Sequence, residues 1–225
     1  MILVGGQSLT TWVEYYKIQL PAFDGPYLTA DADFLGTKAE AEVIARYLNG
    51  RVQVPGMDDH VPNSAVIEFT GKDLLKLQID MLTGVLGVPE ADVKRLATPV
   101  QLNDWKTIHV LHPLLVLKSR CENLMQLAAK RTGNGLTQAK VACAVVTRYL
   151  EQCLADPGRQ RESLKAARKI VELALSEAGI YVWKEWGIDV MGTIDPARMP
   201  GQFSRSWAYA IERVARKREI ASRHG

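Results

Sequence analysis

The most informative stretch of this chain reads LTADADF, from Leu28 to Phe34. Side chains alternate between the two faces of a β-strand, so a strand here places Asp31 and Asp33 on one face together with Thr29. The opposite face is apolar and can pack on a core; it holds Leu28, Ala30, Ala32 and Phe34. Two carboxylates at this spacing repel each other, and a cation between them removes that repulsion.

A second acidic strand follows the same pattern. Residues 75–81 read LKLQIDM, which puts Asp80 on a polar face with Lys76 and Gln78. If this strand pairs beside the first, Asp31, Asp33 and Asp80 converge. Three carboxylates suit Mg²⁺, which prefers oxygen ligands, and two such ions can activate a hydroxyl and stabilise a leaving pyrophosphate. The alternative is an amphipathic strand with Asp on its solvated face, which is common.

A glycine pair follows the first strand. Met1–Val4 is a short apolar run, Gly5 and Gly6 form a tight turn, and helical spacing begins after them, with Ser8 as a candidate cap. Glycines let a backbone approach a ligand closely, and a helix N-terminus offers free N–H groups to phosphate. Gln7 and Ser8 can add side-chain hydrogen bonds. A simple tight turn is the plainer interpretation of a lone glycine pair.

The remaining elements divide into two regions. Thr37 and Glu40 form a capping-box pattern that predicts a helix to about Leu48. Alternation predicts strands at 51–54, 64–70 and 74–82, and a short helix spans 89–96. From His112 onward the spacing is helical, with predicted helices at 113–129, 136–154, 160–178 and 204–222. We therefore expect a mixed α/β domain at 1–105 and a helical domain at 106–225.

Charge follows the same division. Residues 1–100 hold 8 Lys and Arg against 13 Asp and Glu, whereas residues 101–225 hold 20 against 12. An acidic half can hold cations and a basic half can meet phosphates, although solvated surfaces explain both equally simply. On the helix after His112-Pro113, Lys118 is a candidate phosphate contact or a lysine on a solvated face. His112 is expected to cap that helix.

The order of these motifs resembles the nucleotidyltransferase superfamily, with a DNA polymerase beta-like fold. The segments LVGGQSL (Leu3–Leu9) and TADADF (Thr29–Phe34) are most similar to its AbiEii/MenT-type, toxin-like branch. The resemblance implies a mixed sheet with flanking helices over roughly residues 1–120. It implies that Asp31, Asp33 and Asp80 bind two Mg²⁺ ions and act in catalysis. Gly5, Gly6, Gln7, Ser8 and Lys118 would hold a nucleoside triphosphate. Gln7 departs from the small hydroxyl residue that is common there.

Three functions remain open at this point. The first is transfer of a nucleoside monophosphate to tRNA or another RNA held by the basic helices, as in toxin–antitoxin or phage-defence systems, with an antitoxin protein as partner. The second is a non-catalytic RNA- or partner-binding protein on a degenerate scaffold. The third is transfer to a small molecule, such as an antibiotic. Three cysteines without a CxxC pair, and no apolar run of about 18 residues, favour a cytoplasmic protein without a membrane partner.

Overall fold

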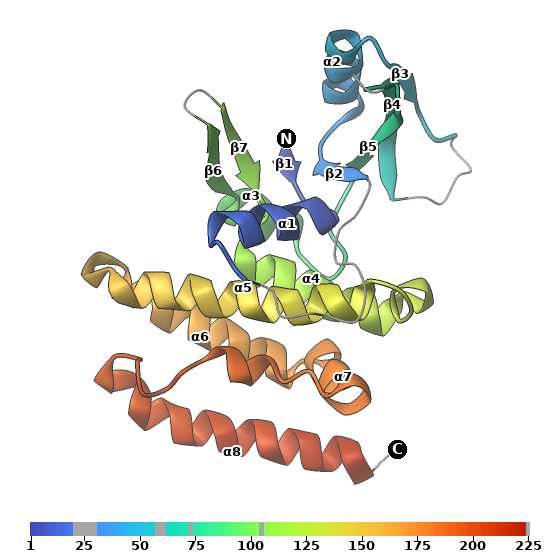
Figure 1. Ribbon diagram of the computed structural model, residues 1–225. Helices are drawn as coiled ribbons and strands as arrows, with labels where there is room; N and C mark the ends of the chain where they lie inside the picture. Colours follow the sequence, from blue (N-terminus) through green and yellow to red (C-terminus); the bar gives the residue numbers. More distant parts are fainter. Residues whose placement is uncertain (20–30, 57–61, 72–73, 104–105, 224–225) are drawn as a thin grey trace. The chain divides into compact units, whose positions relative to one another are not determined.

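The computed structural model describes residues 1–19, 31–56, 62–71, 74–103 and 106–223 (Figure 1). Residues 28–30 of the predicted strand lie outside this described part. The chain divides into two compact units. The described residues of Met1–Tyr15 and Tyr27–Val116 form the first, which we call the sheet unit. Those of Tyr16–Pro26 and Leu117–Gly225 form the second, the helical unit.

The sheet unit is α/β. Its strands are β1 (Ile2–Leu3), β2 (Ala32–Leu35), β3 (Arg51–Gln53), β4 (Asn63–Thr70), β5 (Lys76–Leu82), β6 (Thr98–Asn103) and β7 (Lys106–Val110). Its helices are α1 (Gly5–Tyr15), α2 (Lys38–Leu48) and α3 (Glu90–Leu96), and α4 (Pro113–Gln126) begins in this unit.

The described strands form one mixed sheet in the order β3-β4-β5-β2-β1-β7-β6. β2 runs parallel to β5, and β1 runs parallel to β7. The pairs β1–β2, β3–β4, β4–β5 and β6–β7 are antiparallel. The central position of β2 and β5 brings the two acidic stretches of the sequence side by side.

Helix α2 lies against one face of the sheet at β3 and β4. Thr37 and Glu40 form the predicted capping box, in which the Glu40 amide donates to Thr37 Oγ1 and the Thr37 amide donates to Glu40 Oε2. This backbone hydrogen bond from Thr37 holds the pKa of Glu40 below its usual value. The helix packs on a buried cluster, whose members are Ala41, Ala45, Ala65, Ile67 and Met81. Phe34 and Ile79 pack against this cluster, so the apolar faces of β2 and β5 lie where their alternation predicts.

The β6–β7 hairpin is absent from the sequence-based expectations. Pro99 lies in β6, and proline is typical of a strand only at a sheet edge, which is the position of β6 here. β7 pairs with β1, since Leu3 lies opposite Val110, so residues 106–110 belong to the sheet unit. The expected boundary after residue 105 therefore falls inside the hairpin, whereas the two units divide between Val116 and Leu117.

The helical unit contains most of the predicted helices with small shifts. It holds α5 (Gly135–Ala155), α6 (Gln160–Leu175), α7 (Glu177–Trp186) and α8 (Gly201–Arg223), with short 3₁₀ turns at Ala128–Lys130, Pro157–Arg159 and Val190–Thr193. Helix α6 ends earlier than predicted because Ser176 caps the start of α7, its side chain accepting from the Gly179 amide. Within the described residues, no helix has both the length and the apolar character needed to span a membrane.

Candidate active site

Asp33 and Asp80 are direct neighbours on adjacent strands. The parallel register of β2 and β5 places Asp33 opposite Asp80 and, one residue on, Phe34 opposite Met81. Phe34 and Met81 belong to the face that α2 covers, so the two carboxylates lie on the opposite face. Neighbouring strands are about 4.8 Å apart, which places two acidic side chains close together on one surface. Both are partly exposed and accessible to a ligand.

Gly5 lies directly against the Asp33 side chain. A Cβ atom added at Gly5 would be 1.7 Å from Asp33 Oδ2 and 2.5 Å from Asp33 Cγ. The φ angle of Gly5 is +60°, which glycine adopts without strain. The amide of Val4 also donates to the Asp33 carbonyl oxygen at 2.8 Å. The glycine pair and the acidic strand therefore form one structure, in which the first residue of α1 lies over a carboxylate.

Asp80 is held by two neutral amides. Gln78 Nε2 donates to Asp80 Oδ1 at 2.8 Å, and Asn63 Nδ2 donates to the same oxygen at 3.2 Å. Sequence alternation places Gln78 on this face, but Asn63 was not among the predicted site residues. It lies beside a register shift between Asn63 and Ala65 in the β4–β5 pair, which alternation alone does not reveal. Both bonds engage Oδ1, leaving Oδ2 as the oxygen that can take another partner.

Asp31 is exposed and lies one residue before β2. Across the described ranges, no group of three or more His, Cys, Asp or Glu side chains is arranged to hold a metal ion. The donor chemistry of the Asp33–Asp80 pair nevertheless suits Mg²⁺, because carboxylate oxygens are its usual protein ligands and it keeps several waters. Two carboxylates on one face fit that mode of binding, and Asp31 is the nearest acidic residue along the chain to join them.

The start of α1 differs from the expectation for Ser8. The helix begins at Gly5, so Ser8 lies inside its first turn and does not cap it. The Ser8 hydroxyl is buried and donates to the Gly5 carbonyl at 2.8 Å. Gln7 is partly exposed on the same turn. Gly5, Gly6 and Gln7 therefore carry the N–H groups of a helix start, which lack acceptors within their own helix.

The remaining predicted residues lie on α4 or in the helical unit. His112 caps α4 as expected, because its Nδ1 accepts from the Leu114 amide at 3.2 Å. Lys118 is a half-buried residue of α4 on the helical-unit side of the division, and its contact with phosphate stays a prediction. Several basic side chains of this unit form ion pairs with neighbouring carboxylates; these are Arg148, Arg159, Lys169, Arg198, Arg218 and Arg223.

Comparison with known proteins adds no relative. No protein-family model matches the chain, and no curated protein matches it.

Proposed function

We propose that this chain is a nucleotidyltransferase that moves a nucleoside monophosphate from a nucleoside triphosphate to an acceptor hydroxyl. The fold we propose is the nucleotidyltransferase type. One observation carries the proposal: Asp33 and Asp80 share a sheet face in register, and the start of α1 lies against Asp33 at Gly5. Two carboxylates on one accessible face beside a helix start are an arrangement that suits a divalent cation and a polyphosphate.

Each group of residues has its own role in the proposed reaction. The helix start at Gly5, Gly6 and Gln7 would bind the triphosphate through its backbone N–H groups, while Ser8 holds the turn from inside. The carboxylates of Asp31 and Asp33 would hold the Mg²⁺ ions, while Asp80, which could otherwise ligate the second ion, would act as general base toward the acceptor. When bound, these ions supply charge neutralisation for the triphosphate and for the departing pyrophosphate. Lys118 is proposed as a further phosphate contact.

The reaction forms one bond and breaks one. The acceptor oxygen bonds to the α-phosphorus, and the bond from the α-phosphorus to the bridging oxygen breaks, so pyrophosphate leaves with that oxygen. The hydroxyl proton passes to Asp80 Oδ2, while the amides of Gln78 and Asn63 fix the carboxylate through Oδ1. Catalysis is then mainly positioning and charge neutralisation.

The direct test is transfer from labelled triphosphates in MgCl₂, with RNA and small hydroxyl compounds offered as separate acceptors. Asp33→Ala should lower the rate by roughly 10³-fold, the scale of losing a central electrostatic group. The matched control is Asp92→Ala, which removes an α3 carboxylate of the same unit that pairs with Arg95. It should keep nearly full activity. Equal labelling by wild type and Asp33→Ala removes the catalytic proposal.

A second readout needs no acceptor. Divalent cation that binds only the folded protein raises its stability, so MgCl₂ should raise the unfolding temperature of wild type. MgCl₂ should leave the unfolding temperature of Asp33→Asn unchanged. If neither Mg²⁺ nor triphosphate binds but RNA does, the non-catalytic RNA-binding alternative is favoured. Labelled product from the small acceptors alone favours the small-molecule alternative, and inhibition by an antitoxin partner becomes testable once activity is measured.

A further inference from the structure

A cavity of about 430 Å³ lies on β3, β4 and β5, within the same unit as the carboxylates. Its polar lining includes Arg51, Glu68, Lys76 and Gln78, and its apolar lining includes Phe69 and Leu77. Apart from Gln78, which holds Asp80, these residues belong to neither the proposed metal site nor the α1 start. The cavity is a separate place for a ligand.

The polar lining continues into the carboxylate site. Arg51 lies opposite Glu68, and Glu68 lies opposite Gln78, so the three form one row across three strands. Gln78 precedes Asp80 by two residues, which puts this row on the face that carries Asp33 and Asp80. The Gln78 amide also donates to Asp80 Oδ1 at 2.8 Å. A ligand bound in the cavity therefore contacts a side chain that touches the proposed catalytic carboxylate.

The backbone that lines the cavity is tightly packed at Gly50. Gly50 lines it, and a Cβ atom added there would be 2.6 Å from the Glu68 carbonyl oxygen. The amide of Gly50 donates to the Ala45 carbonyl at 2.8 Å, which closes the end of α2. The space next to Arg51 is thus defined by backbone packing and not only by exposed side chains.

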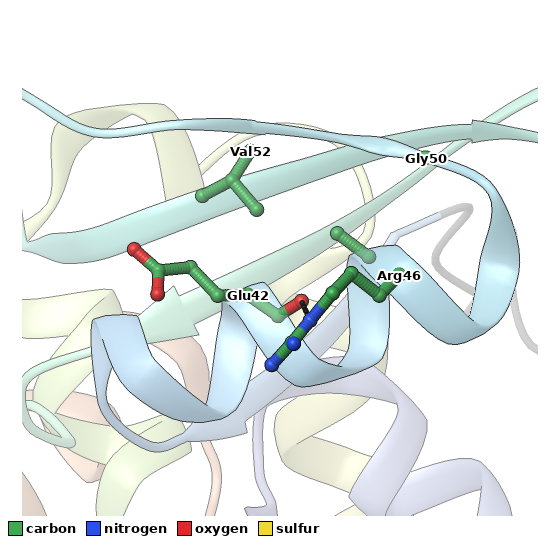
Figure 2. A pocket seen from close by; sticks show the side chains of 5 residues that line it. Glu42, Arg46, Gly50 and Val52 are labelled. Carbon is green, nitrogen blue, oxygen red and sulfur yellow. Dashed lines mark hydrogen bonds between the residues drawn. The ribbon is translucent and has the colours of Figure 1, made fainter.

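The charges of the cavity differ from those of a neighbouring cavity. Arg51, Lys76 and Glu68 are exposed, and for the described part of the chain none of them forms an ion pair within 4.0 Å. The neighbouring cavity, of about 410 Å³, adjoins α2 (Figure 2). There Arg46 lies along its own helix, and its Nε donates to the Glu42 carbonyl at 3.3 Å. Two cations beside Gln78 are therefore available to an anion.

We infer that the β3-β4-β5 cavity binds the nucleotide that presents the acceptor hydroxyl, an inference that rests on the proposed nucleotidyl transfer. Arg51 and Lys76 suit a phosphate ester. Glu68 can accept from a ribose hydroxyl or a base amino group. In the sheet order the carboxylates lie between this cavity and β1, from which α1 starts. Donor and acceptor thus approach from opposite sides.

The cavity is within reach of the reacting atoms. Lys76 and Asp80 are four residues apart on one strand, about 13 Å between their Cα atoms. If Lys76 binds the phosphate of the acceptor nucleotide, the acceptor hydroxyl of that nucleotide would lie along β5, toward Asp80. That hydroxyl then loses its proton to Asp80 as its oxygen bonds to the α-phosphorus, and pyrophosphate leaves on the α1 side. No additional reactant is needed.

The test compares a variant of the cavity with a charge-matched control. R51A/K76A removes the two cations of the cavity, and R46A/K38A removes two cations from α2 in the same unit. Calorimetry measures Kd for two kinds of probe, the nucleoside 5′-monophosphates and a short single-stranded RNA with a free 3′-hydroxyl. R51A/K76A should raise the Kd of the bound probe by about tenfold or more, and R46A/K38A should change it little.

The two arms identify the source of the nucleotide, a free mononucleotide or an RNA end. Asp33→Ala should keep acceptor binding, since the cavity does not use Asp33. Equal affinity of wild type and R51A/K76A, or no binding of either probe to wild type, overturns the acceptor site whether or not transfer occurs. Transfer that depends on Asp33 but has an unchanged acceptor KM in R51A/K76A overturns this inference alone. If wild type binds the acceptor probe but shows no transfer that depends on Asp33, the proposed function is overturned instead.

Discussion

The two units use their charged residues differently. In the helical unit many cations pair with a nearby carboxylate, as in Arg159 with Glu162 at 2.8 Å and Arg148 with Glu151 at 2.7 Å. In the sheet unit, the ion pairs among the described residues involve α2, α3 and the N-terminus. On its polar face Asp80 is instead bound by two neutral amides.

Under the proposed function, this difference separates charge that supports the fold from charge that binds a ligand. An ion pair satisfies both partners and leaves little for a third group. A carboxylate held by amides is oriented but keeps its full negative charge, which a cation or a positively charged substrate can then neutralise.

The sharpest way to break this comparison is Gly5→Ala. Its Cβ atom would collide with the Asp33 carboxylate, and its φ angle of +60° is strained for alanine. We expect a loss of about 3 kcal/mol in the free energy of unfolding, measured with urea. Gly192 of the helical unit has open space around it, so Gly192→Ala should change stability by less than about 1 kcal/mol. Equal stability of both variants would show that α1 does not start against Asp33.

A smaller effect is expected when one carboxylate of each unit is neutralised. Asp80→Asn keeps the shape of the side chain and its Oδ1 hydrogen-bond acceptor, but it removes the charge repulsion between this residue and Asp33. The free energy of unfolding, measured without divalent cations, should therefore rise by about 0.5–1 kcal/mol. Asp189→Asn should lower it by about 1 kcal/mol, because Arg218 Nη1 donates to Asp189 Oδ2 at 2.9 Å. Urea unfolding of both variants measures whether the free energy of unfolding rises or falls in each. A fall for Asp80→Asn would make its carboxylate a structural group.

The smallest expected effect is the loss of stability at acidic pH. Burial raises the pKa of Asp189, but hydrogen bonds from Arg218 and the Met191 amide outweigh it, so the pKa lies below its ordinary value. The stabilisation is then fully present above the unfolded pKa and is lost as the pH falls through the folded pKa. The urea midpoints of wild type and Asp189→Asn should differ steadily at neutral pH and converge below about pH 4. A constant gap down to strong acid contradicts this assignment.

Elements specified by neighbouring residues were predicted well from the sequence. Helix α2 follows from Thr37 and Glu40, which are three positions apart and close its first turn. The faces of β2 and β5 follow from alternation, which put Asp33 and Asp80 on the polar side. Such patterns are visible because the interacting residues are close in sequence, and the same reason explains the correct cap at His112.

Features that depend on distant residues were missed. The β6–β7 hairpin contains a proline, and its place in the sheet depends on pairing with β1, about a hundred residues earlier. Asn63 reaches Asp80 through a register shift, and the cavity near Arg51 depends on where α2 ends against β4. The placement of Ser8 was wrong because the helix starts at Gly5, in a glycine conformation that propensity does not anticipate.

The contact between Gly5 and Asp33 also has an electrostatic consequence. The peptide dipoles of α1 sum to a partial positive charge at its first turn, and the Asp33 carboxylate already lies against that end. An incoming polyphosphate would have to share this positive end with a fixed anion. The affinity for metal-free triphosphate should therefore be low, and Mg²⁺ should raise it.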